Sequence, residues 1–213
     1  MNAVGRLLSG KVIVATHNAG KLREMRELLE PYGIDAVSAG ELRLPEPEET
    51  GADFISNALI KARSAAQLAH LPSFADDSGL CVEALDGAPG IHSARFAKEA
   101  GGFAQAMAKV DALMCASGQA SRRGYFVSAL ALVWPDGFER TFEASVHGDI
   151  VWPPRGERGF GYDPFFLPDG HTLTFGEMSS DEKHGIPADG SQALSHRARA
   201  FQMLARECLP PKA

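Results

Sequence analysis

The chain of 213 residues contains few cysteines that could form disulfide bonds and no long apolar run that could span a membrane. Its three cysteines, Cys81, Cys115 and Cys208, lie far apart, and none forms a Cys-x-x-Cys pair. An odd, unpatterned set of cysteines favours a reducing compartment over a disulfide framework. The longest apolar run, Phe126 to Trp134, is interrupted by Ser128 and is far shorter than the roughly 20 residues that span a bilayer. We therefore expect a cytoplasmic protein that has no membrane partner.

An excess of positive charge is also missing. The 21 Lys and Arg residues stand against 27 Asp and Glu residues, which gives a formal net charge of −6. This balance argues against a protein that coats a nucleic-acid backbone, because such proteins concentrate positive charge. It still allows a small anionic ligand, since a few cations, backbone amides and a divalent metal can bind a phosphate locally. With no repeat and no clear linker, residues 1–213 read as one domain with a core of roughly residues 11–207.

The pattern of apolar residues predicts an α/β fold. The β-branched stretch Lys11 to Ala15 indicates a buried strand, which runs through a polar turn into a helix that ends near Leu29. A second strand is expected at Ile34 to Val37, and this β-loop-α-β order favours parallel pairing. Asp53 is a candidate N-cap for an alanine-rich helix. A short strand from Ser73 to Ala75 is expected to end at the pair Asp76-Asp77.

The second half of the chain predicts a hairpin and two further helices. Strands are expected at Arg123 to Trp134 and at Phe138 to Val146, with a Pro-Asp-Gly turn between them. This hairpin could form a second lobe within the continuous domain. Helices are expected at Phe103 to Cys115 and at Ser195 to Cys208, where apolar residues recur at helical spacing.

The segment Thr16 to Lys21 lies between a strand and a helix, where a phosphate site can form. Backbone amides at a helix N-terminus, a hydroxyl, an amide and a lysine are suitable ligands for phosphate. The spacing T-x-N-x-x-K is not that of a Walker A loop. A capped strand-to-helix turn with a solvated Lys21 is the alternative.

The adjacent carboxylates of Asp76 and Asp77 form the second candidate site. They repel each other, so a nearby cation would stabilise them, and Mg²⁺ prefers such hard oxygen ligands. The acidic loop that contains Glu46, Glu48 and Glu49 could add a ligand. The alternatives are a turn at Asp76 to Gly79 and a solvated surface loop.

Two later segments could bind a base. In Gly159 to Pro164 the ring of Phe160 could stack on a nucleobase, or it could anchor the loop to the core. Lys183, His196 and Arg197 could donate hydrogen bonds to a ligand. His196 and Arg197 open a helix, where the helix dipole does not favour cations, and they could otherwise be exposed charges.

Several motifs occur together and in a recognisable order. They are VIVATHNAGKLREMRELL, EETGADFISNALIKA, FADDSGLCVEALDGAPGIHSARFA, GFGYDPFF, EMSSDEK and SHRARA. From about Lys11 to Leu204 the chain resembles the inosine triphosphate pyrophosphatase family, also called the Ham1-like family. The resemblance implies an α/β fold with a mixed sheet, flanking helices and two lobes around a long central cleft, and a homodimer. It also implies Mg²⁺-dependent hydrolysis of the purine nucleoside triphosphates ITP, dITP and XTP to the monophosphate and pyrophosphate.

The resemblance also assigns roles to individual residues. Asp77 would be the general base. Asp77, Glu48 and Asp76 would be the metal ligands. The predicted substrate-binding residues are Thr16, His17, Asn18, Ala19, Gly20, Lys21, Lys61, Ser78, Phe160, Gly161, Tyr162, Asp163, Lys183, His196 and Arg197. Donors at Lys183, His196 or Arg197 would suit the C6 oxygen of hypoxanthine or xanthine, and adenine would leave them unpaired.

The chain departs from the family pattern at two places. His17 stands where many members have glycine, so it could crowd the phosphate loop or add a donor. Residues 184–194 form an insertion between Lys183 and Ser195, which could displace Lys183 and His196 from their expected positions. Two alternatives to the predicted function remain, namely a pyrophosphatase for other modified nucleotides and a nucleotide-binding regulator without turnover.

Overall fold

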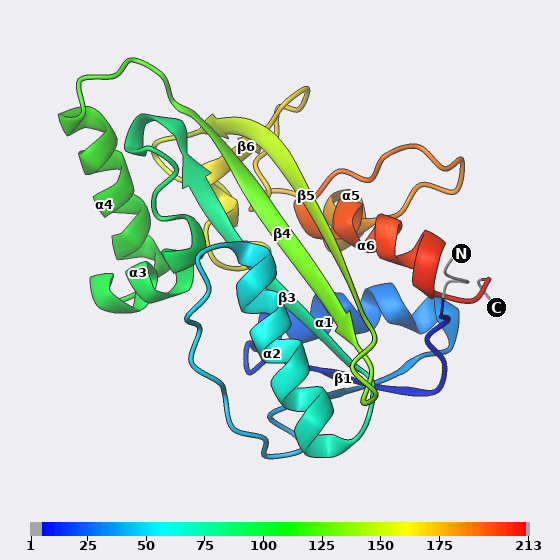
Figure 1. Ribbon diagram of the computed structural model, residues 1–213. Helices are drawn as coiled ribbons and strands as arrows, with labels where there is room; N and C mark the ends of the chain where they lie inside the picture. The colour runs from blue at the N-terminus through cyan, green and yellow to red at the C-terminus, as the bar shows by residue number, and fades with distance from the viewer. Residues whose placement is uncertain (1–5, 212–213) are drawn as a thin grey trace. The chain divides into compact units, whose positions relative to one another are not determined.

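The computed structural model describes residues 6–211 and has an α/β fold with one mixed sheet (Figure 1). The strand order is β2-β1-β3-β4-β5-β6. The strands are β1 (Lys11–Val14), β2 (Asp35–Ser38), β3 (Ser73–Val82), β4 (Arg123–Val133), β5 (Glu139–Ile150) and β6 (Phe166–Pro168). Because β1 pairs in parallel with β2 and β3 while β5 pairs antiparallel with β6, the predicted fold class and the predicted parallel start are confirmed.

The helices flank the sheet and agree with four of the sequence predictions. They are α1 (Ala19–Leu29), α2 (Phe54–Ala69), α3 (Ser93–Ala100), α4 (Phe103–Ala116), α5 (Ser180–His184) and α6 (His196–Cys208). The helices expected after the phosphate loop, after Asp53, from Phe103 and at the end of the chain correspond to α1, α2, α4 and α6. The sequence did not predict α3 and α5. No helix in residues 6–211 is long and apolar enough to cross a membrane.

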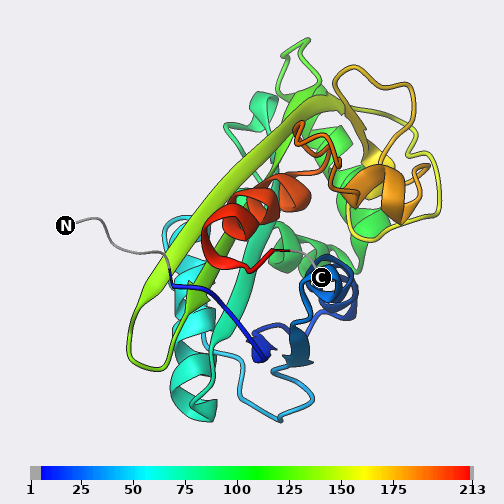
Figure 2. The same ribbon diagram turned by 90° about the vertical axis from the view of Figure 1, so that its right-hand side faces the viewer.

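The chain divides into two compact units, and each is built from separate stretches of sequence. Of the described residues, the first unit contains those up to Asp77, those of Ala129–Ala144, and those from Arg197 onward. The second unit contains Ser78–Ser128 and Ser145–His196. The predicted hairpin does form, and β4 and β5 are long neighbouring strands in both views (Figures 1 and 2). It is not a lobe of its own, because residues 129–144 belong to the first unit and the rest to the second.

Buried apolar residues of β1, α1 and α6 form much of the core of the first unit. Val12, Ile13 and Val14 of β1 are 0–2% exposed, as the β-branched stretch predicts. Met25 of α1 is fully buried, as is Phe201 of α6, whose ring meets Tyr32 edge to face at 6.0 Å. The predicted apolar stripe of the last helix therefore packs into this core.

Aromatic side chains and the helices α3 and α4 build the core of the second unit. The ring of Phe126 lies 4.9 Å from that of Phe166 and 6.1 Å from that of Phe175. Buried side chains of α4, Met107 and Val110 among them, belong to the same cluster. Figure 1 shows α3 and α4 next to each other, and their many mutual contacts agree with this view. Large rings of this kind supply much of the buried apolar area in a small core.

The strand β3 is longer than the sequence suggested. The prediction that it ends at Ala75 is wrong, because β3 continues through Asp76, Asp77 and Ser78 to Val82. Aspartate and serine are typical of turns, which is why the stretch read as one. Here both carboxylates are buried and contact lysine side chains, so they can remain inside a strand.

Candidate functional site

The predicted phosphate loop lies between β1 and α1 in the first unit. Asn18 caps α1, and its Oδ1 accepts hydrogen bonds from the backbone amides of Gly20 and Lys21 at 2.9 and 3.1 Å. Thr16 Oγ1 accepts a further bond from the Asn18 amide at 3.1 Å. Asn18 and Ala19 are exposed, and Thr16 is half-buried. The segment therefore forms an ordered, accessible helix start, the type of structure to which phosphates bind. The predicted phosphate contacts of Thr16 to Lys21 remain a prediction.

Lys21, Asp76 and Arg197 meet in a buried cluster of charges, together with Glu24. Lys21 Nζ lies 2.9 Å from Asp76 Oδ2, and Arg197 donates to the same oxygen at 3.2 Å. The other side of the Arg197 guanidinium donates to a Glu24 carboxylate oxygen. Because these groups neutralise one another, they can stay buried, with Glu24, Asp76 and Arg197 only 2–5% exposed.

This cluster changes the acidity of Lys21. Burial lowers the pKa of the Lys21 ammonium below its ordinary value, the neighbouring cations Lys61 and Arg197 lower it further, and Asp76 only partly offsets these effects. Lys21 thus holds its proton less firmly than an exposed lysine. Arg197 was predicted to contact the base, whereas the structure places its guanidinium on Glu24 and Asp76, so its contact with substrate remains a prediction.

The predicted general base Asp77 is buried next to α2. Lys61 Nζ lies 2.7 Å from Asp77 Oδ1 and 2.9 Å from Glu49 Oε1, and donates to the backbone oxygen of Asp76 at 3.0 Å. Asn57 Nδ2 lies 3.5 Å from Asp77 Oδ2, at the outer limit of a hydrogen bond. Asn57 and Lys61 are four residues apart, so both point from one face of α2 toward Asp77.

Burial and charge act in opposite directions on this pair. Burial raises the pKa of Asp77 above its usual range, and the nearby Lys61 and Lys21 offset part of that rise. Burial alone would lower the pKa of Lys61, but the carboxylates of Asp77 and Glu49 outweigh it and raise the pKa. A carboxylate with a raised pKa beside cations has the properties expected of a general base in a binding site.

The oxygen ligands around Asp77 fit the predicted Mg²⁺ in part. Within residues 6–211, no group of three or more His, Cys, Asp or Glu side chains has the arrangement of a metal site. Asp76 and Asp77 are neighbours in a strand, where consecutive side chains point to opposite faces, and they contact different lysines. The carboxylates of Asp77 and Glu49 nevertheless converge on one ammonium ion. Mg²⁺ often takes one or two carboxylates and completes its shell with water and phosphate, so these residues fit the ion.

Glu49 is the acidic-loop residue that the structure places beside Lys61. Its carboxylate makes the 2.9 Å contact with that ammonium, whereas the side chain of Glu48 is exposed. The metal roles predicted for Asp76, Asp77 and Glu48 remain predictions.

The side chain of His17 lies against the start of the acidic loop. Its Nε2 lies 3.2 Å from the backbone oxygen of Leu44, and its Nδ1 lies 3.9 Å from Glu46 Oε1. His17 and Lys61 also line one small cavity with Pro45, Glu46 and Pro47. The histidine therefore connects the predicted phosphate loop to the acidic loop, and a contact with phosphate remains a prediction.

In the second unit, the glycine-rich loop is built around Asp163. Asp163 Oδ2 accepts hydrogen bonds from the Phe160 amide at 2.8 Å and from Lys183 Nζ at 2.7 Å. Gly159 has a φ of +74°, and a Cβ there would overlap Asp163 Oδ2, so the loop needs glycine at this position. Lys183 Nζ also lies 5.9 Å from the centre of the Phe160 ring. The structure thus brings together Phe160, Asp163 and Lys183, three of the predicted substrate-binding residues.

The side chains of Tyr162 and His196 pack inside the second unit. The Tyr162 hydroxyl donates to the backbone oxygen of Ser93 at 3.1 Å, and its ring packs edge to face on Phe103. The imidazole of His196 stacks on Phe126, with the ring centres 4.8 Å apart and the planes 11° apart. Both side chains are nearly buried, at 3% and 5% exposure. The binding roles of Tyr162, His196, Gly161 and Ser78 remain predictions.

Residues 184–194, which the sequence analysis predicts to be an insertion, do not separate the residues on their two sides. The Ser195 amide donates to the Lys183 backbone oxygen at 3.1 Å, and His184 Nδ1 lies 2.8 Å from Ser195 Oγ. The two ends of the insertion therefore meet, and Lys183 keeps its contact with Asp163. Whether Lys183 and His196 are displaced from the positions that the family implies remains a prediction.

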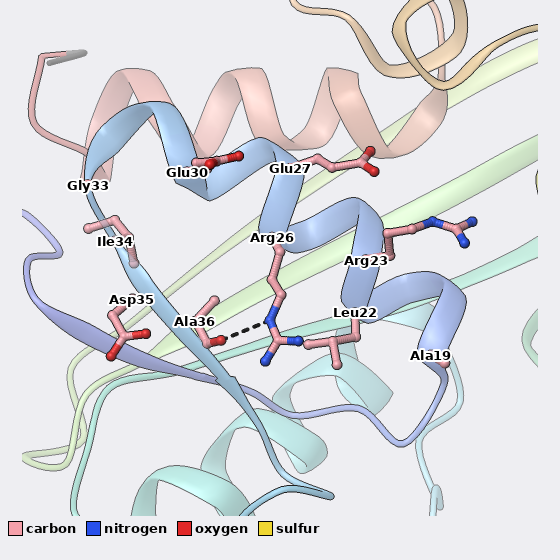
Figure 3. A pocket seen from close by; sticks show the side chains of 10 residues that line it. All are labelled: Ala19, Leu22, Arg23, Arg26, Glu27, Glu30, Gly33, Ile34, Asp35 and Ala36. Carbon is pink, nitrogen blue, oxygen red and sulfur yellow. Dashed lines mark hydrogen bonds between the residues drawn. The ribbon is translucent and has the colours of Figure 1, made fainter.

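A larger groove of about 820 Å³ lies on the first unit between α1 and β2 (Figure 3). Leu22, Arg23 and Glu27 line it from the helix, and Ile34 and Asp35 line it from the strand side. Arg26 crosses this region and donates to the Ala36 backbone oxygen at 3.0 Å. Of the predicted site residues, only Ala19 lines this groove, so its size does not make it the site of the chemistry.

The sequence analysis missed three residues of these clusters. It assigned no site role to two of them and left the role of the third undecided. The sequence analysis singles out neither Glu24 nor Asn57, and Glu49 is one of three candidate residues in the acidic loop. A signal was available for two of them: Glu24 follows Lys21 by three residues, and Asn57 precedes Lys61 by four, which places each pair on one helix face. For Glu49 the sequence offered no signal that separates it from Glu46 and Glu48.

Comparison with known proteins identifies the family. A model of the Ham1 family matches residues 12–207, and the chain belongs to this family. The dITP/XTP pyrophosphatase of Bradyrhizobium diazoefficiens is 60% identical over 210 residues, which cover 97% of this chain and 99% of that protein. The dITP/XTP pyrophosphatase of Rhodopseudomonas palustris is 60% identical over 207 residues, which cover 96% and 98%.

The fold agrees with this assignment. The structure of a Ham1 protein from Coxiella burnetii superposes with a TM-score of 0.80 at 35% sequence identity, and the match covers 93% of this chain and 98% of that one. The family suggested by the sequence motifs is therefore confirmed, as is the mixed α/β fold.

Proposed function

We propose that this protein hydrolyses the deaminated purine nucleoside triphosphates ITP, dITP and XTP to the nucleoside monophosphate and pyrophosphate. The observation that carries the mechanism is the buried Asp77 carboxylate, held by Lys61 at 2.7 Å in a unit that also contains the accessible helix start at Asn18. The substrate class rests on relatives that carry the name dITP/XTP pyrophosphatase and match almost the whole chain. Hydrolysis of these nucleotides would remove them before polymerases use them as substrates.

In the proposed reaction, water attacks the α-phosphorus, the bond to the bridging oxygen breaks, and pyrophosphate leaves. Asp77 orients this water and accepts its proton, for which a carboxyl with a raised pKa is suited. The helix start at Asn18 and the ammonium groups of Lys21 and Lys61 bind the triphosphate oxygens. Mg²⁺, held by Asp77 and acidic-loop carboxylates, would neutralise phosphate charge and stabilise the leaving group.

Recognition of the base is assigned to Phe160, Lys183, His196 and Arg197. Phe160 offers a ring face for stacking, and Lys183 and His196 offer donors for the C6 oxygen of hypoxanthine or xanthine. A predicted homodimer in the cytoplasm belongs to the same proposal.

The test is release of pyrophosphate from ITP in the presence of Mg²⁺. The wild type should turn over, and Asp77→Asn should lose at least about 100-fold in kcat, because loss of a general base typically costs 10²–10⁴-fold. Asp169→Asn is the matched control, since Asp169 is exposed and pairs with Arg123 in the second unit. No release by the wild type, or full activity of Asp77→Asn, would overturn the proposal.

A substrate panel separates the alternatives. Preference for dUTP or a methylated pyrimidine nucleotide over ITP would favour a pyrophosphatase for other modified nucleotides. Binding of ITP without turnover would favour a regulator.

A further inference from the structure

The ammonium of Lys61 is surrounded by oxygen atoms from two parts of the chain. Its nearest partners are Asp77 Oδ1 at 2.7 Å, Glu49 Oε1 at 2.9 Å and the Asp76 backbone oxygen at 3.0 Å. The side chains of Lys61 and Asp77 are only 9% and 7% exposed. Two carboxylates and a carbonyl thus enclose one positive charge almost completely.

The same oxygen atoms are the type of ligand that Mg²⁺ prefers. Carboxylate and carbonyl oxygens bind hard divalent cations, and Asp77 is one of the predicted metal ligands. An ammonium and a divalent cation cannot both contact one carboxylate pair at low cost, because like charges at contact distance repel strongly in a buried site. Lys61 and the metal therefore compete for Asp77 and Glu49.

We infer that Lys61 holds the place of the divalent cation in the metal-free protein and leaves Asp77 and Glu49 when the cation binds. The flexible four-carbon stem of lysine allows this movement, and its strongly hydrated ammonium tolerates a return to water. The freed ammonium becomes available to the phosphate oxygens of the substrate. Lys61 thus has two successive partners, the carboxylates first and the substrate afterwards. This inference rests on the Mg²⁺ dependence of the proposed function.

The first experiment compares the wild type with Lys61→Gln in the absence of nucleotide, with MgCl₂ as the probe. Without metal, Lys61→Gln should melt at a lower temperature, because Asp77 and Glu49 lose their counter-ion. Mg²⁺ should raise its melting temperature more than that of the wild type. Calorimetric titration should show Mg²⁺ binding to Lys61→Gln at least about tenfold more tightly, since a competing charge has been removed.

Lys183→Gln is the matched control. Lys183 is also a buried lysine, and it lies 2.7 Å from Asp163. This variant should also lose thermal stability, but Mg²⁺ should not restore it, and the Mg²⁺ affinity should stay at the wild-type value. Equal or weaker Mg²⁺ affinity of Lys61→Gln would overturn the inference, because Lys61 would then be a fixed partner of Asp77.

A second measurement uses the wild type alone and does not depend on the folding of a variant. Acetylation by acetic anhydride, mapped by mass spectrometry, should modify Lys61 several-fold faster with MgCl₂ than with EDTA. Lys183 should react at the same rate in both. Unchanged or slower labelling of Lys61 overturns the inference, as does a failure of the wild type to bind Mg²⁺. Pyrophosphate release from ITP is measured separately, so the proposed function can stand when this inference fails.

Discussion

At the scale of single residues, burial decides how an ionisable side chain behaves, and Cys208 shows this away from the candidate site. This thiol in α6 is 1% exposed, and burial raises its pKa from 9.0 to about 11. In the unfolded chain the thiol ionises near pH 9, whereas in the folded protein it stays protonated up to about pH 11. Ionisation therefore favours the unfolded chain in this window and has no effect below it.

The prediction is a loss of stability specific to alkaline pH. Between pH 9 and 11, the free energy of unfolding of the wild type should fall relative to that of Cys208→Ala. The expected difference in slope is about 1.4 kcal/mol per pH unit. Urea denaturation at pH 8 to 11 measures it, and the slope matters rather than the offset, because the variant also loses packing. Parallel curves for the two proteins would contradict the prediction.

Single residues also show where prediction from sequence ends. The motifs and the family resemblance were sufficient to single out Lys21, Lys61, Asp76 and Asp77 as candidate site residues. Local spacing indicates that Asn57 and Lys61 share one helix face, but it does not indicate that both contact Asp77. Arg197 and Glu24 are separated by 173 positions, and nothing in either local pattern predicts that they meet. Such a pair is defined by tertiary structure alone.

At the scale of elements, α2 carries Asn57 and Lys61 and depends on its cap. Asp53 accepts a hydrogen bond from the Ser56 amide at 2.7 Å, as expected of the predicted N-cap. Just before it, the Gly51 amide donates to Asn57 Oδ1 at 2.8 Å. A Cβ at Gly51 would lie 2.6 Å from that oxygen, so glycine allows this close approach.

Replacing the cap should weaken the start of this helix. Asp53→Ala leaves an amide of the first turn without its acceptor, and we expect the melting temperature to fall by about 2–4 °C. Asp53→Asn should stay close to the wild type, because asparagine caps as well as aspartate. Differential scanning calorimetry at pH 7 compares the three proteins. Equal losses in both variants would show that the charge of Asp53, and not its cap, is what matters.

The predictability of the elements followed their length and capping. Helices α1, α2, α4 and α6 have 11 to 16 residues with a clear apolar face, so their pattern was sufficient. The helix α5 has five residues, which are too few for a periodic signal, and its one local mark is the capping box of Ser179 and Glu182. The local pattern does not predict the end of β3, because the burial of Asp76 and Asp77 depends on lysines of other elements, Lys21 and Lys61.

At the scale of the whole molecule, the net charge of −6 leads to a prediction about nucleic acid. Four cations among the predicted site residues each contact a carboxylate, namely Lys21, Lys61, Lys183 and Arg197. We therefore expect no retention of labelled DNA above background in a filter-binding assay, even at about 50 mM salt, because binding to a backbone needs clustered positive charge. Retention that declines as salt is raised would contradict this expectation.

The division of each unit into separate stretches has a consequence for synthesis on the ribosome. The first unit needs residues up to Asp77, residues of the hairpin and residues from Arg197 onward, so it cannot be completed until α6 has been made. Structures that depend on such distant partners form slowly. Until α6 emerges, Glu24 and Asp76 lack Arg197, which contacts both in the finished protein. Until that helix has been made, the nascent chain therefore carries these early acidic residues without the counter-charge of Arg197.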